Sequence, residues 1–181
     1  MIPDFISKRS KTRLELLGWY QIVGGVAGVV VTFWILSKTV QITTTMLLLF
    51  LIAFALYCFS VYCGKLLLGA QYSRGLSLSI LNQVPQMVSF AFIGYAYQYN
   101  AGAAVELAIS YGSGTVSSGL NFGVDFGMMS KWLFSIASDD LSFKLSVNFL
   151  AVYLIYFIDK LRGALRHEKV NHEIAGIEPE I

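Results

Sequence analysis

The chain has 181 residues, of which 56% are hydrophobic and only 13% are charged. About a quarter of the residues of an ordinary soluble domain carry a charge, so this composition argues against a soluble protein and for lipid as the surrounding solvent. The formal net charge of +2 is too small for the basic footprint of a nucleic-acid-binding protein, and we expect no nucleic-acid partner.

Two long apolar runs open the chain. Residues 16–36 read LLGWYQIVGGVAGVVVTFWIL, and residues 46–68 read MLLLFLIAFALYCFSVYCGKLLL. Each reaches the roughly 20 residues that a helix needs to cross the hydrocarbon core of a bilayer. The first run is too long for the core of a signal peptide, and no cleavage site of small residues follows it. We therefore expect two uncleaved transmembrane helices.

The first run also contains a helix-packing motif. Gly24 and Gly28 are four residues apart and lie on one face of a helix, a spacing that lets a second helix approach closely. Such motifs are common in membrane spans, so packing within one chain is favoured over pairing between two chains.

A third apolar run, residues 76–97, contains the polar stretch LNQVPQ. If the run is a third span kinked at Pro85, three amides fall close together on it: Asn82, Gln83 and Gln86. Two further amides in the other runs are candidate partners, and they are Gln21 and Asn148. We expect this intramembrane amide cluster to join helices by hydrogen bonds, because no ionisable residue accompanies it. Binding of a small polar ligand or a lipid is the alternative.

Between residues 104 and 137 the apolar residues recur with a period of two, which is typical of strands. Two such runs flank the glycine-rich segment GSGTVSSG and predict a β-hairpin in which Tyr111 pairs with Leu120 and Glu106 with Asp125. Residues 130–137 alternate as well and are a candidate third strand, and residues 39–43 a candidate fourth. An open sheet edge is not tolerated in hydrocarbon, so we place this hairpin outside the membrane.

One face of the predicted hairpin is entirely apolar. Its members are Val105, Leu107, Ile109, Leu120, Phe122, Val124 and Phe126. Such a face needs a cover, which is a partner protein, the lipid surface or the outer ends of the helices. On the opposite face we expect Glu106 and Asp125 to be solvated. A weak divalent-cation site shared with Asp139 and Asp140 is the less favoured alternative, because it has too few ligands.

A shorter fourth run, residues 141–158, is the last predicted span, and residues 159–181 are predicted to be a loosely ordered tail. With four spans and a cytoplasmic N-terminus, ten Lys and Arg residues fall inside and three outside. This asymmetry predicts that both termini are cytoplasmic, in what is most simply a bacterial inner (plasma) membrane.

The sequence therefore predicts an all-α membrane protein with four transmembrane helices and a small extramembrane β-hairpin between spans 3 and 4, all in one domain covering residues 1–181. We find no catalytic or metal-ligand pattern and expect neither an enzyme nor a cofactor. The expected function is a non-enzymatic accessory or interaction subunit of a membrane or envelope complex, with a membrane protein or a further copy of the chain as partner. The alternative is a protein that binds or transports a small molecule or lipid through the amide cluster.

Overall fold

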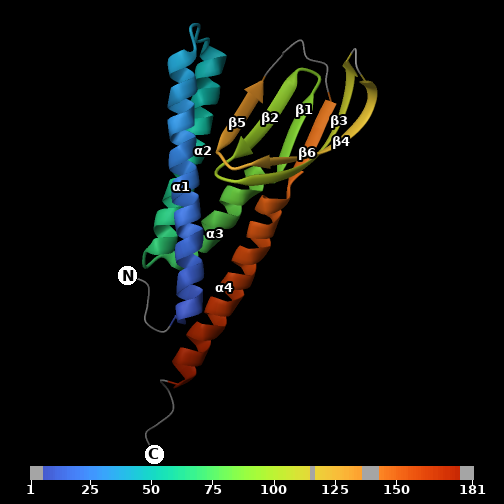
Figure 1. Cartoon of the computed structure of the whole chain (residues 1–181). Coiled ribbons are helices and arrows are strands. Elements are labelled where there is room, and N and C mark those ends of the chain that lie inside the picture. Colours follow the sequence, from blue (N-terminus) through green and yellow to red (C-terminus); the bar gives the residue numbers. More distant parts are fainter. Residues whose placement is uncertain (1–5, 115–116, 136–142, 176–181) are drawn as a thin grey trace, which may run out of the picture.

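A computed structural model describes residues 6–114, 117–135 and 143–175 (Figure 1). It contains four α-helices, which are α1 (Lys8–Lys38), α2 (Thr44–Leu68), α3 (Tyr72–Gln83) and α4 (Phe149–Ala175). It also contains six strands, which are β1 (Val88–Phe92), β2 (Tyr95–Asn100), β3 (Ala104–Gly114), β4 (Ser117–Gly127), β5 (Lys131–Ser135) and β6 (Phe143–Asn148). The strands form one antiparallel sheet in the order β4-β3-β6-β1-β2-β5. The prediction of an all-α protein with only a small hairpin is therefore wrong.

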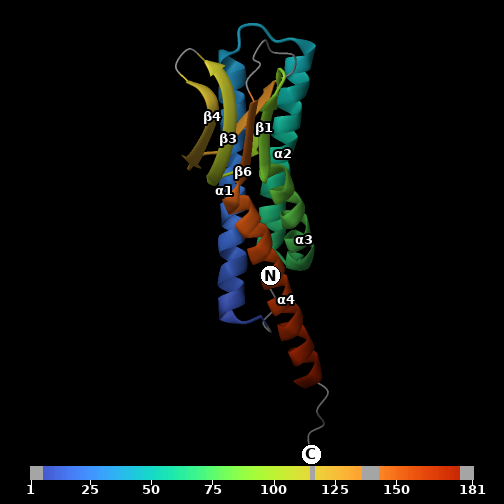
Figure 2. The same cartoon turned by 90° about the vertical axis from the view of Figure 1, so that its right-hand side faces the viewer.

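The first two apolar runs form the helices α1 and α2, which stand side by side as an antiparallel pair (Figures 1 and 2). The side chains of Ser7 and Thr43 cap them by accepting hydrogen bonds from backbone N–H groups of the first turn. Within the described residues, α1 and α2 are the two helices that are long and apolar enough to cross a membrane.

Glycines bring the two helices close together. A Cβ atom on Gly64 of α2 would lie 2.5 Å from the carbonyl oxygen of Gly18 in α1, and a Cβ atom on Gly28 would collide with the ring of Tyr57. Gly24 has a different neighbour, because a Cβ atom there would lie 2.6 Å from the carbonyl oxygen of Ala101, which follows β2. The two glycines of the predicted motif thus face two different elements of the same chain, α2 and the sheet.

The predicted third span, residues 76–97, is wrong. It begins as the short helix α3, passes through a single 3₁₀ turn at Val84–Gln86, and then becomes the strands β1 and β2. We expected Pro85 to kink a continuous helix, but α3 ends two residues before it, because proline offers no backbone N–H to continue the helical hydrogen bonds. The strands have an alternating pattern, VSFAF followed by YAYQYN, and this signal was masked by the high hydropathy of the whole run.

The predicted fourth span, residues 141–158, is wrong for a similar reason. Its first described residues form β6, and the helix α4 starts only at Phe149. Asn148 starts that helix, since its side-chain oxygen accepts hydrogen bonds from the backbone N–H groups of Leu150 (3.1 Å) and Ala151 (3.3 Å). Helix α4 continues to Ala175, so the predicted loosely ordered tail is helical over residues 159–175.

The C-terminal half of α4 is fastened to the start of α1. The Glu168 carboxylate accepts hydrogen bonds from the hydroxyls of Ser7 (2.7 Å) and Ser10 (2.8 Å) and from the Ser7 backbone N–H (3.0 Å). Partial burial raises the pKa of this carboxyl, but the hydrogen bonds outweigh it, and the net pKa lies below its usual value.

The register of the predicted hairpin is confirmed. Strands β3 and β4 pair with Tyr111 opposite Leu120 and Glu106 opposite Asp125. The hairpin is nevertheless part of a larger sheet, because β3 also pairs with β6 along six residues. The predicted third strand exists as β5, but it pairs with β2, at the other edge of the sheet. Residues 39–43 form a loop between α1 and α2 and no strand.

The sheet lies beside the upper half of the helix pair, and its lower end is level with the middle of α1 (Figure 1). The Ser130 hydroxyl donates a 2.6 Å hydrogen bond to the Gly24 carbonyl in the middle of α1, and the Tyr57 hydroxyl of α2 donates one to the Asn100 carbonyl (3.3 Å). The ring of Trp132 in β5 meets Phe50 of α2 edge-on. The sheet is thus at the same height as the most apolar parts of α1 and α2, whereas the sequence placed the hairpin beyond their ends.

Candidate functional site: a sheet with its polar face inside

The sheet has two faces of opposite chemistry. Because side chains alternate along a strand, the registers assign each residue to one face. We call one the apolar face; its members are Val88, Phe90, Phe92, Tyr95, Tyr97, Tyr99, Val105, Leu107, Ile109, Tyr111, Leu120, Phe122, Val124, Phe126, Trp132, Phe134, Phe143, Leu145 and Val147. We call the other the inner face; it includes Ser89, Gln98, Asn100, Glu106, Ala108, Asn121, Asp125, Lys144, Ser146 and Asn148.

Burial on this sheet is the reverse of that in a water-soluble protein. On the inner face the polar side chains of the central strands are buried, with Glu106 exposed by 3% and Ser146 by 1%. On the apolar face Phe122 and Phe126 are exposed by 70% and 73%. Only the end of this face next to the helices is covered, where Tyr99 and Trp132 pack against α2. The sequence-predicted face of Leu107, Ile109, Phe122, Val124 and Phe126 lies at the uncovered end, so it does not cap the helices.

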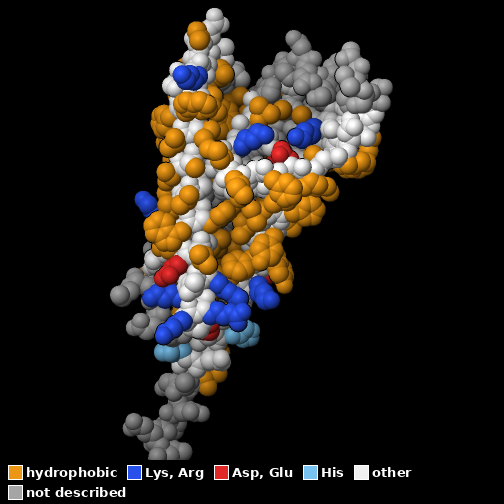
Figure 3. All heavy atoms as spheres, in the orientation of Figure 1, with side chains coloured by type: hydrophobic (Ala, Val, Ile, Leu, Met, Phe, Trp, Pro, Cys, Tyr) orange, Lys and Arg blue, Asp and Glu red, His pale blue; other side chains and the backbone are white. Residues whose placement is uncertain are grey.

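Figure 3 shows how these surfaces are distributed. Apolar side chains cover the upper helix pair and the lower flank of the sheet. Lys and Arg side chains gather in a zone below them, around the start of α1 and the lower part of α4.

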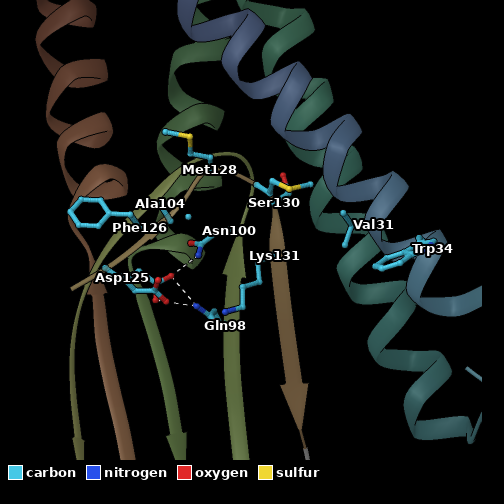
Figure 4. A pocket seen from close by; sticks show the side chains of 13 residues that line it. Val31, Trp34, Gln98, Asn100, Ala104, Asp125, Phe126, Met128, Ser130 and Lys131 are labelled. Atoms are coloured by element: carbon cyan, nitrogen blue, oxygen red, sulfur yellow. Dashed lines mark hydrogen bonds between the residues drawn. The ribbon is translucent and has the colours of Figure 1, made fainter. Parts of the chain in front are cut away.

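Glu106 is the centre of the inner face. Its carboxylate accepts hydrogen bonds from the Gln98 amide (3.0 Å to each oxygen), the Asn100 amide (2.6 Å) and the Ser146 hydroxyl (3.2 Å). These donors come from β2 and β6, so the carboxylate of β3 is linked both to its neighbouring strand β6 and, across the sheet, to β2, which is separated from β3 by β6 and β1. Figure 4 shows Gln98 and Asn100 on β2, and dashed lines mark the hydrogen bonds that their amides donate. Our prediction that Glu106 is solvated is wrong, because the sheet curves around it.

Next to this cluster is a hollow of about 430 Å³ between the inner face and α1. The Glu106 cluster lies on one side of it, Val31 and Trp34 of α1 lie on the other, and Asp125 and Lys131 are also among its lining residues (Figure 4). Both oxygens of Glu106 already accept two hydrogen bonds each, which leaves Asp125 as the carboxylate available to a ligand. Asp139 and Asp140, proposed from the sequence to complete a cation site, lie outside the described residues. Among the described residues, no three His, Cys, Asp or Glu side chains are grouped closely enough to hold a metal ion.

The predicted amide cluster is divided between two places. Gln21 and Asn82 lie between the helices, where the Ser79 hydroxyl donates to the Gln21 side-chain oxygen (3.1 Å) and the Asn82 amide donates to the Ser60 hydroxyl (3.2 Å). Asn148 lies in the sheet, and its amide donates to the side-chain oxygen of Asn100 (3.1 Å).

Gln86 links the amides between the helices to the sheet. Its amide donates to the Asn82 carbonyl (2.9 Å), and its side-chain oxygen accepts from the backbone N–H of Ala101 (2.8 Å). Gln83 is different, since both its amide atoms are buried without a hydrogen-bond partner among the described residues. The structure therefore gives Gln86 a clear role in connecting helix and sheet and gives none to Gln83.

Sequence reasoning missed Gln98, Asn100 and Ser146, which hold Glu106. Gln98 and Asn100 alternate with Tyr95, Tyr97 and Tyr99, and this alternation was the signal that could have found them.

The chain matches no protein-family model, no curated protein and no solved structure.

The cross-strand pair Glu106 and Asp125 offers a matched test of the inner face. Glu106→Gln places an amide N–H₂ group opposite the donors of Gln98 and Asn100, so we expect a loss of about 1–3 kcal/mol in the free energy of unfolding. Asp125→Asn changes an exposed carboxylate and should change it by no more than about 0.5 kcal/mol. Chemical denaturation in detergent measures both, and equal effects would contradict the assignment of Glu106 as the centre of the network.

Gln86 and Gln83 form a second matched pair. Gln86→Leu removes two buried hydrogen bonds and leaves the Ala101 N–H unpaired, so unfolding should become easier by about 1–3 kcal/mol. Gln83→Leu replaces an unpartnered buried amide by an apolar group and should be neutral or stabilising. Thermal unfolding in the same detergent compares them, and a larger loss for Gln83→Leu would show that its amide has a partner or ligand.

Proposed function

We propose that this chain is an integral membrane protein, anchored by α1 and α2, that works as a non-enzymatic interaction subunit of a membrane complex through its sheet. The observation that carries the proposal is the apolar face, which is uncovered and lies beside the anchoring helices. Water is a poor solvent for a face that includes Phe122 at 70% and Phe126 at 73% exposed. Lipid and a membrane protein partner are the environments that suit it.

The reversed burial of the sheet supports a membrane environment. Strands that cross membranes have apolar residues outside and polar residues inside, and they are about 9–11 residues long. Strands β3 and β4 have 11 residues each, and they follow this pattern over residues 105–111 and 120–126.

The packing of α1 supports a retained anchor over a cleaved signal sequence. Leu14 and Leu17 are buried in the core shared by α1, α2, α3 and α4, and Gln21 is fully buried. Removing α1 would expose this core and the partners of Gly24 and Gln21, so the described fold requires the helix.

The charges support the predicted orientation. The ten basic residues assigned to the cytoplasmic side lie on the start of α1, the end of α2, the start of α3 and the second half of α4, which share the lower end of the molecule (Figures 1 and 2). They are Lys8, Arg9, Lys11, Arg13, Lys65, Arg74, Lys160, Arg162, Arg166 and Lys169. The positive-inside rule places this end in the cytoplasm, in keeping with a bacterial inner membrane.

Labelling of single cysteines tests this orientation in a background without Cys58 and Cys63. A cysteine at Lys38, at the upper end of α1, should react with an impermeant reagent added from outside. Cysteines at Ser77 and Asn171, on the exposed surfaces of α3 and α4, should react only after the membrane is opened. Reaction of the Asn171 position from outside would exclude the proposed orientation.

A charge on the apolar face tests the interaction. Phe122→Asp should leave the core folded, because the side chain is exposed, but should remove the partner by placing a carboxylate in an apolar contact. Val40→Asp is the matched control, an exposed apolar residue in the loop between α1 and α2. Cross-linking in membranes followed by purification compares them. Loss of the partner from both variants, or from neither, would contradict an interaction through the sheet.

Ligand binding is the second candidate function, and the hollow between α1 and the inner face is the observation that favours it. The amide cluster is a weaker basis than the sequence indicated, because Asn82, Gln86 and Asn148 already have protein partners. A small molecule or lipid retained in native mass spectrometry, with no protein partner, would favour this candidate.

A further inference from the structure

Strand β4 is the outer edge of the sheet and is unprotected. Within the described residues it pairs with β3 alone, and it is the element farthest from the helix pair (Figures 1 and 2). The side chains from Leu120 to Phe126 are all exposed. The opposite edge, β5, is shorter and lies beside α1 and α2, with Trp132 against Phe50.

Strand β4 lacks most of the usual devices that keep an edge strand from pairing. It has no proline and no lysine, and it runs for 11 residues. Its single charged residue, Asp125, belongs to the inner face, and this inward charge is the one such device it has. The glycines at 119 and 123 leave open space around the backbone, since a Cβ atom at either would have no neighbour within 4 Å. The hydrogen-bonding edge itself is open because, within the described residues, β4 pairs with β3 alone.

The sheet lies beside the apolar part of α1, and at this depth in a membrane an unpaired strand edge is unfavourable in free energy. An open row of backbone N–H and C=O groups is not tolerated in hydrocarbon, where each unsatisfied group costs several kcal/mol. Strand β4 belongs to the sheet that contacts α1 at Gly24, near the middle of its apolar run. If the apolar face meets lipid, the edge of β4 needs a partner strand in the membrane.

We propose that this partner is β4 of a second copy of the chain, which pairs with it antiparallel about a two-fold axis. The proposal rests on the proposed function and names the partner. Strand β4 itself has the length and the alternation that the edge requires, so two copies keep all apolar residues on one side and all polar residues on the other. The joined sheet has six plus six strands, and its outermost strands are the two copies of β5, each beside its own helix pair.

The two faces restrict the register. Apolar residues of β4 occupy even positions, so an antiparallel pairing must place even opposite even and odd opposite odd. We assign the register centred on Gly123, which sets Asn121 opposite Asp125 of the second copy and Phe122 opposite its Val124. In this register the side-chain amide of Asn121 can donate a hydrogen bond to the Asp125 carboxylate of the second copy. Within its own chain this Asp125 lies opposite Glu106. The two copies of Asp125 are not opposite each other, so their like charges stay apart.

Disulfide cross-linking of the full-length protein in its native membrane tests the pairing, with Cys58 and Cys63 replaced by alanine. Under mild oxidation Gly123→Cys should form a homodimer, because directly opposed residues of two strands are within disulfide reach. Leu133→Cys, exposed on β5, is the matched control and should stay monomeric. In cells that produce two differently tagged chains, Asn121→Cys on one and Asp125→Cys on the other should cross-link, and Asn121→Cys alone should not.

Several results would overturn the pairing. The first is the absence of homodimer from Gly123→Cys and from every other single cysteine at 119–126, with the variants still folded by thermal unfolding. The second is equal cross-linking of Leu133→Cys, which would indicate random collision. The third is a cross-link from Gly123→Cys to a chain of different mass, which would refute self-pairing and leave the proposed interaction function standing. A homodimer together with failed labelling at Lys38 would instead support the pairing and refute the membrane orientation.

Discussion

The polar face of the sheet lies inside the protein, and the positions of the other strands and of the apolar side chains follow from this. A carboxylate that is 3% exposed needs its hydrogen bonds within the protein, and Glu106 receives them from Gln98, Asn100 and Ser146. Satisfying it requires β2, β3 and β6 to curve around one point. Because side chains alternate, that same arrangement turns every aromatic residue and every Val, Leu and Ile of these strands to the opposite, apolar face.

The helices and the sheet are joined by polar contacts as much as by apolar ones. Gly24 has no side chain, which allows the Ala101 backbone to approach α1, and the Ser130 hydroxyl binds the carbonyl of Gly24. Gln86 extends this junction from α3 to the residue that follows β2. Such directional contacts hold the sheet at one height along α1 and α2, and this height is the reason for treating its outer face as a membrane surface.

Local pattern predicted those parts of the fold whose signal is short-range. The runs 16–36 and 46–68 are long and almost entirely apolar, and they form α1 and α2. The alternation around GSGTVSSG predicted the pairing of Tyr111 with Leu120, because a one-residue slip would mix the two faces. The runs 76–97 and 141–158 were wrongly predicted to be membrane helices for the same reason. A strand with large aromatic residues on one face can have a mean hydropathy as high as that of a membrane helix. The alternation of β1, β2 and β6 was visible but was outweighed by run length.

The apolar composition, the two long helices, the hairpin register and the separation of basic residues from apolar runs can all be read from the order of the amino acids. These features follow from residue type and spacing along a few turns of chain. In contrast, the joining of β3 and β4 to four further strands, the burial of Glu106 and the position of the apolar face beside the upper half of the helices are visible only in the folded chain. Those features depend on pairings between residues far apart in the chain, such as Glu106 with Asn148 and Gly24 with Ser130. Contacts of this kind leave no periodicity in the sequence, because their geometry is set only when the strands and helices pack.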